Sequence, residues 1–121
     1  MTHIAVLGTG LLGTGVVEGL LARGVPVVVW NRTAAKTEPL VSLGARVAKS
    51  AAEAVRGASR VHLVLTDDEA VDSVLGAIAA DVAPGVCVLD HTTTLPTRTA
   101  ERATRLEKAG MTFLHAPVFM S

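Results

Sequence analysis

The stretch Ile4-Ala5-Val6-Leu7-Gly8-Thr9-Gly10-Leu11-Leu12-Gly13 decides the fold. Its apolar start is typical of a buried parallel strand, and an apolar segment with helical spacing follows the pattern Gly-x-Gly-x-x-Gly. In this pattern Gly8 allows a tight turn, Gly10 lets a pyrophosphate approach the backbone, and Gly13 lets the helix pack closely against the strand. The unpaired N–H groups at the start of a helix also attract phosphate. The stretch therefore predicts a dinucleotide site, in preference to a glycine turn that is only structural.

The composition restricts the class of protein. The chain has 121 residues, half of them hydrophobic, which suits one domain with a sizeable core. A formal net charge of zero argues against a broad electrostatic surface for nucleic acid or a membrane, and one Trp with two Phe disfavours a stacking platform for single strands. We expect no membrane span and no signal peptide. The single cysteine, Cys87, lies in an apolar run, which predicts a buried, reduced thiol in a cytoplasmic protein rather than a reactive one.

Strand-like and helix-like segments alternate along the whole chain. Strands are predicted over residues 3–7, 25–30, 45–48, 60–65, 86–89 and 111–115. Helices are predicted over residues 11–23, 34–42, 51–56, 66–80 and 97–109. This alternation predicts an α/β fold with a Rossmann-type, doubly wound parallel sheet in the order 3-2-1-4-5-6 between two layers of helices. Residues 1–121 would then form a single NAD(P)-binding domain.

Polar residues at the predicted helix ends are interpreted as caps. Ser50 precedes one helix, and Thr94 precedes another that has Pro96 in its first turn. The acidic run Thr66-Asp67-Asp68-Glu69 is interpreted as a cap and first turn rather than a metal site, because adjacent carboxylates there do not converge. The solvent-facing side of the last helix is predicted to carry Arg98, Glu101, Arg102, Arg105 and Lys108.

The end of the second predicted strand indicates which nucleotide is bound. In NAD-binding versions of this fold, an acidic residue about 20 residues past the glycines holds the ribose 2′-hydroxyl. Here Asn31-Arg32-Thr33 occupies that region. A guanidinium can form two charge-assisted bonds to a 2′-phosphate, which a carboxylate would repel. The sequence therefore favours NADP(H) over NAD(H); the alternative is a solvated Arg32 with Thr33 as a helix cap.

A second polar stretch, Asp90-His91-Thr92-Thr93-Thr94-Leu95-Pro96, follows the fifth predicted strand. Loops at the carboxyl ends of the strands face the ligand in such sheets. We therefore expect some of these threonines to contact the nicotinamide end and the substrate. His91 could act as a general acid or base, but a packing or hydrogen-bonding role is favoured for a histidine in such a loop.

Four motifs together resemble the β-hydroxyacid dehydrogenases. They are Gly8-Thr9-Gly10-Leu11-Leu12-Gly13, Trp30-Asn31-Arg32-Thr33, the stretch from Asp90 to Pro96, and His115-Ala116-Pro117-Val118. This family includes 3-hydroxyisobutyrate dehydrogenase, tartronate semialdehyde reductase, the 6-phosphogluconate dehydrogenases and the related imine reductases. The motifs occur in the family's order, and the resemblance covers the whole chain.

The resemblance implies the N-terminal NADP-binding domain of an oxidoreductase that transfers hydride between NADP(H) and a small carbonyl, hydroxyacid or imine. It implies a cofactor site made of Gly8, Thr9, Gly10, Leu11, Leu12, Gly13, Asn31, Arg32, Thr33, Leu65, Thr66 and Thr93. Leu65 and Thr66 match the loop that borders the adenosine half. Thr92 and Thr93 match a Ser-Thr pair near the nicotinamide and the substrate, and Phe119 occupies a substrate position.

The chain departs from the family pattern in three ways. His115 stands where the family has Asp, and Phe119-Met120-Ser121 stand where it has Ser-Gly-Gly. Because Phe cannot hydrogen-bond a carboxylate, a less polar carbonyl or an imine is favoured over a hydroxyacid. The family also continues into a helical domain that carries the catalytic lysine, beyond Ser121. The resemblance therefore implies no catalytic residue in this chain, and we interpret it as a fragment that binds cofactor without turnover.

Two further expectations concern assembly and alternative functions. Without a covering domain, the apolar residues of the last strand and its exit would associate with another copy; they are Phe113, Leu114, Val118, Phe119 and Met120. A non-catalytic nucleotide-binding or sensor module remains an alternative function. A domain that binds S-adenosylmethionine or a sugar nucleotide is disfavoured by Arg32 and the intact glycine triplet.

Overall fold

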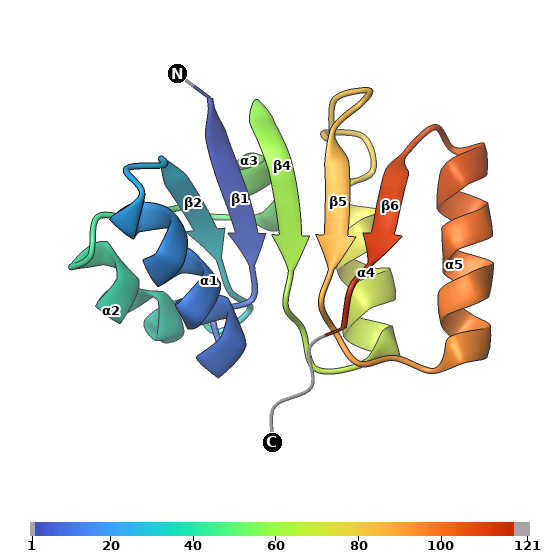
Figure 1. Cartoon of the computed structure of the whole chain (residues 1–121), viewed down its shortest axis with the longest axis horizontal. Helices are drawn as coiled ribbons and strands as arrows, with labels where there is room; N and C mark the ends of the chain where they lie inside the picture. The colour runs from blue at the N-terminus through green and yellow to red at the C-terminus, as the bar shows by residue number, and fades with distance from the viewer. Residues whose placement is uncertain (1, 118–121) are drawn as a thin grey trace.

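The computed structural model describes residues 2–117 as a six-stranded parallel sheet in the order β3-β2-β1-β4-β5-β6 (Figure 1). The strands are β1 (His3–Leu7), β2 (Val27–Trp30), β3 (Arg46–Val47), β4 (Ala58–Leu63), β5 (Cys87–Asp90) and β6 (Thr112–His115). Every pair of neighbouring strands is parallel, which confirms the predicted fold class and strand order. The predicted substrate contact Phe119, like Val118 and Met120, lies outside the described residues.

Helices cover both faces of the sheet (Figure 1). They are α1 (Leu11–Ala22), the 3₁₀ turn η1 (Ala34–Thr37), α2 (Glu38–Val41), α3 (Ala51–Val55), α4 (Asp68–Ile78) and α5 (Pro96–Lys108). The segment predicted as one helix over 34–42 is split, because Pro39 has no N–H and is tolerated only in the first turn of α2. None of the described helices is long and apolar enough to cross a membrane.

The central strand β1 has a side chain in each of two cores. Val6 packs with α1, α2 and β2 in one buried cluster, whereas Leu7 packs with α3, α4 and α5 in the other. Successive side chains of a strand point to opposite faces of the sheet, so an unbroken apolar run fills both layers. The strands are thereby held rigidly, with all six carboxyl ends at one edge of the sheet.

The structure corrects three predictions, which concern the bounds of the fourth strand, the cap of the last helix and the burial of Cys87. β4 occupies Ala58–Leu63 rather than 60–65, because Leu65 has left the ladder and donates its N–H to the Thr92 hydroxyl at 2.9 Å. The N-cap residue of α5 is Leu95, so the prediction for Thr94 was wrong. The hydroxyl of Thr94 is paired with that of Thr99 instead. Cys87 is half-buried rather than fully buried.

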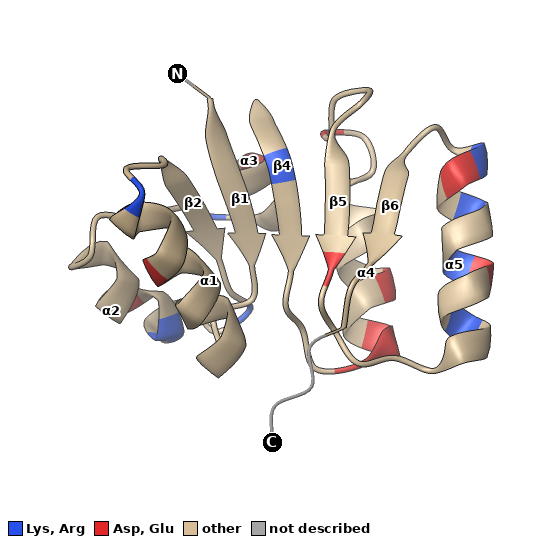
Figure 2. Ribbon diagram, in the orientation of Figure 1, with Lys and Arg blue, Asp and Glu red and all other residues tan. Residues whose placement is uncertain are grey.

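The acidic run at the start of α4 has two roles. Asp67, not Thr66, is the cap, and its carboxylate accepts the N–H of Ala70 at 2.9 Å. Asp68 instead accepts the N–H of Leu95 at 3.0 Å and pairs with Arg102. The ribbon coloured by charge shows acidic positions on α4 and basic positions on α5 (Figure 2).

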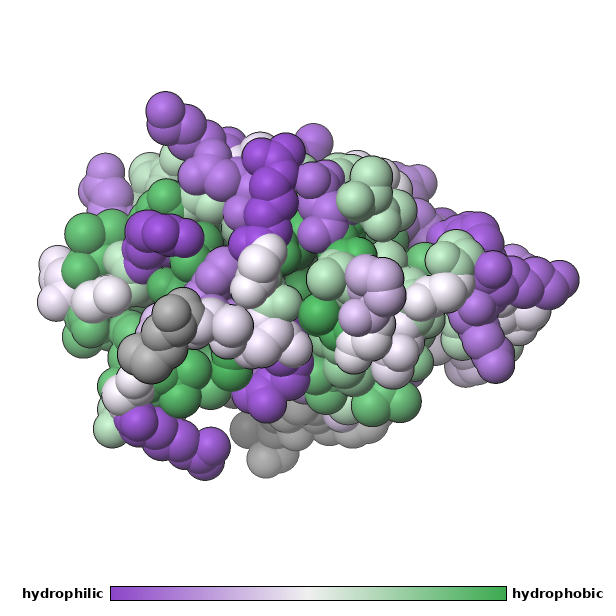
Figure 3. All heavy atoms as spheres, turned by 90° about the horizontal axis from the view of Figure 1, so that it is seen from above, coloured by the Kyte–Doolittle hydropathy of each residue, from purple (hydrophilic) through white to green (hydrophobic). Residues whose placement is uncertain are grey.

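Arg102 corrects the prediction that the charged residues of the last helix all face solvent. It is only 1% exposed, and it bridges two carboxylates of α4, Asp68 at 2.8 Å and Asp72 at 2.7 Å. The other predicted positions, among them Arg98 and Arg105, are exposed. Seen from the amino ends of the strands, hydrophilic side chains gather at the end of the molecule that α5 forms (Figure 3).

Candidate functional site: the cleft at the carboxyl ends of the strands

The three glycines of the first turn have different surroundings. Gly8 has a φ of 105°, and a Cβ there would lie 2.0 Å from the carbonyl oxygen of Val64. A Cβ on Gly13 would lie 2.1 Å from the carbonyl oxygen of Gly8, so α1 packs directly on the turn. A Cβ on Gly10 would meet nothing within 4 Å. The turn therefore requires two glycines for its own packing and leaves the backbone at Gly10 open to a ligand.

Asn31 ties the glycine turn to the end of β2. Its Oδ1 accepts the N–H of Thr9 at 3.0 Å, and its Nδ2 donates to the carbonyl of Thr33 at 2.9 Å. The hydroxyl of Thr9 donates to the carbonyl of Lys36 at 3.3 Å, and Thr9 is buried. Both Asn31 and Thr9 thus shape the wall of the site through contacts inside the protein.

A cleft of about 520 Å³ runs along this edge of the sheet. It brings together the predicted site residues Gly8, Gly10, Leu11, Leu12, Asn31, Arg32, Thr33, Leu65, Thr66, Thr92 and Thr93. Thr9 and Gly13 do not line it, because they pack behind its wall. Gly10 is the N-cap residue of α1, and within the described residues no side chain caps it. The first N–H groups of α1 are therefore left for a ligand.

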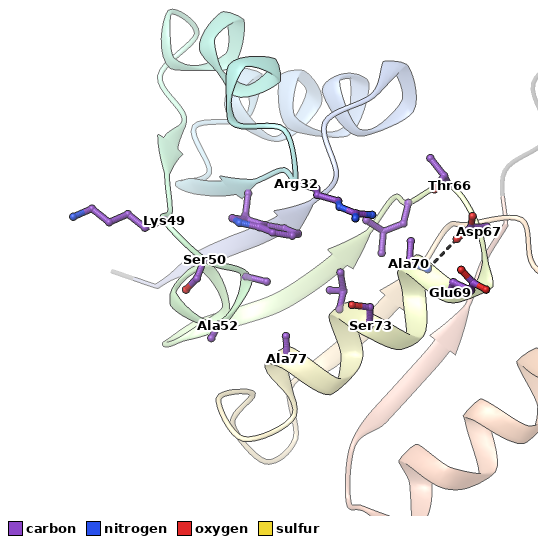
Figure 4. Close-up of a pocket in the computed structure, with 14 residues that line it drawn as sticks. Arg32, Lys49, Ser50, Ala52, Thr66, Asp67, Glu69, Ala70, Ser73 and Ala77 are labelled. Atoms are coloured by element: carbon purple, nitrogen blue, oxygen red, sulfur yellow. Dashed lines mark hydrogen bonds between the residues drawn. The ribbon is translucent and has the colours of Figure 1, made fainter.

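A second cleft, of about 720 Å³, adjoins the first between β2, α3 and α4. Arg32, Leu65, Thr66 and Ala70 line both clefts. Figure 4 shows Arg32 reaching from the end of β2 toward Thr66 at the start of α4. The guanidinium of Arg32 therefore lies where the two clefts meet.

Sequence reasoning missed two cations at these clefts. Lys36 is exposed and lines the first cleft, and Lys49 lines the second. The spacing Arg32-x-x-x-Lys36 could have indicated the first, since the two residues flank a single turn of chain after β2. Lys49 follows β3, and only the order of the strands brings it to the same edge.

The loop between β5 and α5 places two threonines at the cleft, one almost fully buried and one exposed. Thr92 is 2% exposed, its hydroxyl accepts the N–H of Leu65, and its own N–H donates to Asp90 at 2.9 Å. Thr93, the next residue, is exposed and lines the cleft. Thr93 is thus the accessible member of the predicted pair.

His91 is hydrogen-bonded at both ring nitrogens. Its Nδ1 lies 3.0 Å from the carbonyl oxygen of Ala116, and its Nε2 lies 2.8 Å from Nδ1 of His62. The two rings stack with centroids 5.1 Å apart. Burial, followed by the nearby charge of Arg60 and by His91, lowers the pKa of His62 to about 4. The pair therefore shows the hydrogen-bonding role that the sequence favoured for His91.

The lowered pKa of His62 predicts a loss of stability in mild acid. The unfolded chain binds the proton near pH 6.5 and the folded chain only near pH 4, so acidification through that interval favours unfolding. Between pH 7 and pH 5, His62 should remove roughly 2 kcal/mol from the free energy of unfolding. Urea unfolding of the parent and of His62→Asn at both pH values measures this difference. An equal pH dependence in the two proteins would contradict it.

The amino-acid sequence that forms these clefts is similar to sequences of known proteins. Residues 3–119 match the NAD binding domain of 6-phosphogluconate dehydrogenase. The chain is 38% identical over 118 residues to the cytokine-like nuclear factor N-PAC of Xenopus tropicalis, across 95% of this chain and 22% of that protein.

Two solved structures are similar across the entire chain. Mycobacterium tuberculosis 3-hydroxyisobutyrate dehydrogenase, solved with L-serine, has a TM-score of 0.93 at 30% identity and is covered over 42% of its length. A reductive aminase from Aspergillus terreus, solved with NADPH and ethyl levulinate, has a TM-score of 0.87 at 30% identity, also over 42% of its length.

The present chain thus spans less than half the length of these three proteins. The comparisons confirm the resemblance to the 3-hydroxyisobutyrate dehydrogenases and imine reductases that the four motifs indicated, since an imine reductase from Aspergillus terreus is similar at the same TM-score of 0.87 and 30% identity. With residues 3–119 matched, this chain belongs to the family of the NAD-binding domain of 6-phosphogluconate dehydrogenase.

Proposed function

We propose that this chain is the NADP(H)-binding domain of an oxidoreductase that transfers hydride between the nicotinamide and a small carbonyl, hydroxyacid or imine substrate. The position of Arg32 at the junction of the two clefts carries this proposal. No carboxylate occupies the end of β2, where an NAD-specific site would hold one. The reductive aminase from Aspergillus terreus, solved with NADPH, supports the same nucleotide.

Each part of the nucleotide has a matching part of the clefts in this proposal. Gly10, where the backbone is open and α1 begins, would hold the pyrophosphate. Leu65 and Thr66, which line the larger cleft, would border the adenosine half. Arg32 would hold the 2′-phosphate, and the ammonium group of Lys36 would add a second positive charge from the smaller cleft, which Arg32 also lines.

The nicotinamide half follows the smaller cleft toward the loop after β5. Thr93 is the exposed hydroxyl on that path, whereas buried Thr92 holds the loop. When bound, the cofactor would supply or accept the hydride. Thr93 would orient the nicotinamide ring, with the substrate beside it.

A complete reaction needs a proton donor as well as a hydride. The resemblance assigns that donor to a lysine of a helical domain, so we expect residues 1–121 alone to bind cofactor without turnover. We also propose that β6 of this chain associates with another copy of the chain or with that helical domain. This strand lies at the edge of the sheet, and Leu114 on it is 54% exposed.

Replacement of Arg32 tests the proposed nucleotide specificity. The parent chain should bind NADPH more tightly than NADH in calorimetric titrations. Arg32→Ala should lower the affinity for NADPH about 10- to 150-fold, since a hydrogen bond to a charged group is worth about 1.5–3 kcal/mol. The affinity for NADH should change little.

Arg23→Ala is the matched control, because Arg23 is also exposed but follows the far end of α1. It should leave both affinities unchanged. Failure of the parent chain to bind either nucleotide would contradict the proposal. An equal loss of NADPH and NADH affinity in Arg32→Ala would contradict the 2′-phosphate contact alone.

A second candidate is a non-catalytic nucleotide-binding module. The 38% identity to N-PAC, whose name is that of a nuclear factor, favours it. The two candidates differ in turnover. NADPH oxidation by a full-length gene product, assayed with small carbonyls and imines, would support the enzyme, and binding without oxidation across that panel would support the module.

A further inference from the structure

We propose that His91 and His115 form a reciprocal clasp between the β5–α5 loop and the exit of β6, which positions Thr93 for the nicotinamide half of the cofactor. Each histidine donates to the backbone of the segment that carries the other. This inference rests on the proposed function, because Thr93 matters only if the cleft holds a dinucleotide.

The first half of the clasp runs from the loop to the exit of β6. Nδ1 of His91 lies 3.0 Å from the carbonyl oxygen of Ala116. A carbonyl can only accept, so Nδ1 carries the proton and Nε2 of the neutral ring accepts from His62 at 2.8 Å. Nε2 of His62 in turn accepts from Nε of Arg60 at 2.9 Å. A donor that cannot lose its proton therefore sets the direction of the whole chain of hydrogen bonds.

The second half runs from β6 back to the loop. Nε2 of His115 lies 2.9 Å from the carbonyl oxygen of Thr92 and 3.3 Å from the hydroxyl of Thr94. For the same reason, Nε2 of His115 carries its proton. The two residues that His115 contacts, Thr92 and Thr94, precede and follow Thr93 in the sequence, and Thr93 itself is exposed. His115 thus holds the backbone around the residue that faces the cleft.

Backbone contacts complete the frame around Thr93. The N–H of Ala116 donates to the carbonyl of Asp90 at 2.8 Å, and the carboxylate of Asp90 accepts the N–H of Thr92 at 2.9 Å. On the other side, the Thr92 hydroxyl is held by Leu65. A loop that is ordered before binding loses less entropy when the ligand arrives.

The contact from β6 to the loop requires a side chain that can donate. An ionised carboxylate at position 115 could not donate to the carbonyl of Thr92, whereas Nε2 of His115 does so at 2.9 Å. We assign His115 and His91 as positioning residues, acting through Thr93 rather than on the substrate.

Binding of whole and half nucleotides to two His115 variants tests the clasp. His115→Leu removes the donor, whereas His115→Gln keeps an N–H near the position of Nε2. His115→Leu should weaken NADPH about 5- to 10-fold, as expected for a loop that must be ordered on binding. It should leave the affinity for 2′,5′-ADP, which lacks the nicotinamide half, unchanged. His115→Gln should bind both ligands like the parent chain.

The outcomes separate this inference from the proposed function. If the parent chain binds neither ligand, the proposed function fails and the clasp has no role. If the parent chain binds both and His115→Leu weakens neither, or weakens both equally, only the clasp is overturned. A general loss of folding would lower both affinities together, so it cannot imitate the expected split.

A spectroscopic measurement on the parent chain tests the clasp without a destabilising variant. At pH 8, ¹⁵N chemical shifts of the imidazole rings should show His91 as the Nδ1–H tautomer and His115 as the Nε2–H tautomer. The opposite tautomer at either ring, or rapid exchange between the two, would overturn the proposal.

Discussion

Replacing Arg102 with Ala is expected to lower the free energy of unfolding by about 3–5 kcal/mol. The guanidinium is 1% exposed and joins Asp68 and Asp72 of α4 to α5. Its removal would leave the carboxylate of Asp68, which is 7% exposed, without the cation that compensates its burial. The hydrogen bond from Arg102 is also the main cause that lowers the pKa of Asp72 to about 2.

The matched control is Arg105→Ala. Nη2 of Arg105 reaches the same Oδ1 of Asp72 at 3.2 Å, but its side chain is 61% exposed. Solvent screens such a pair, so the control should lose less than about 1 kcal/mol. Denaturant unfolding at pH 7 measures both changes, and NMR titration should show the pKa of Asp72 rising in Arg102→Ala. Equal losses in the two variants would contradict the buried role of Arg102.

Acid should remove the same stabilisation in the parent chain. Asp72 has a pKa of about 2 when folded and an ordinary pKa of 3.8, so its contribution is complete above about pH 4. It is lost as the pH falls through the folded value. The bond from Arg102 lowers the pKa of Asp68 in the same direction.

The second large effect is expected at Gly13. Gly13→Ala should lower the free energy of unfolding by about 3 kcal/mol or more, because the added Cβ would lie 2.1 Å from a backbone oxygen of Gly8. That oxygen belongs to a turn that Gly8 itself holds against Val64, so neither side can move freely. Thermal and urea unfolding measure the loss.

Gly15→Ala is its matched control in the same helix. Gly15 is exposed, and a Cβ there would meet nothing within 4 Å. Alanine should therefore stabilise α1 by up to about 1 kcal/mol through its higher helix propensity. A comparable loss in both variants would show that the helix, rather than the contact with the turn, is sensitive.

The architecture and most of the candidate cleft were predictable because their causes are local. Gly8 and Gly13 belong to one turn, and Arg32 follows its strand directly, so spacing along the chain was enough to identify them. Parallel strands place their carboxyl ends at one edge, which is why residues such as Thr66 and Thr93 line the same cleft. These features need only periodicity and the handedness of the connections.

Contacts between distant residues were not predictable. Arg102 has the helical spacing of an exposed charge, and only the packing of α5 against α4 buries it beside Asp68. His62 and His91 are 29 residues apart, and the pairing of β4 with β5 brings them together. Lys49 is different, because it follows β3 and the predicted order of the strands could have indicated its position beside the larger cleft.

The sequence by itself determined the strand–turn–helix unit around Gly10 and the cation at the end of β2, because each depends on neighbouring residues. It also indicated the order of the sheet, because strands and helices alternate along the chain. The tertiary structure decided which side chains of the loop after β5 are exposed and which are held by hydrogen bonds inside the protein. It buries Thr92, leaves Thr93 exposed and engages both ring nitrogens of His91. Hydrogen bonds between segments that lie far apart in the chain determine this burial and exposure, and no local sequence pattern encodes those contacts.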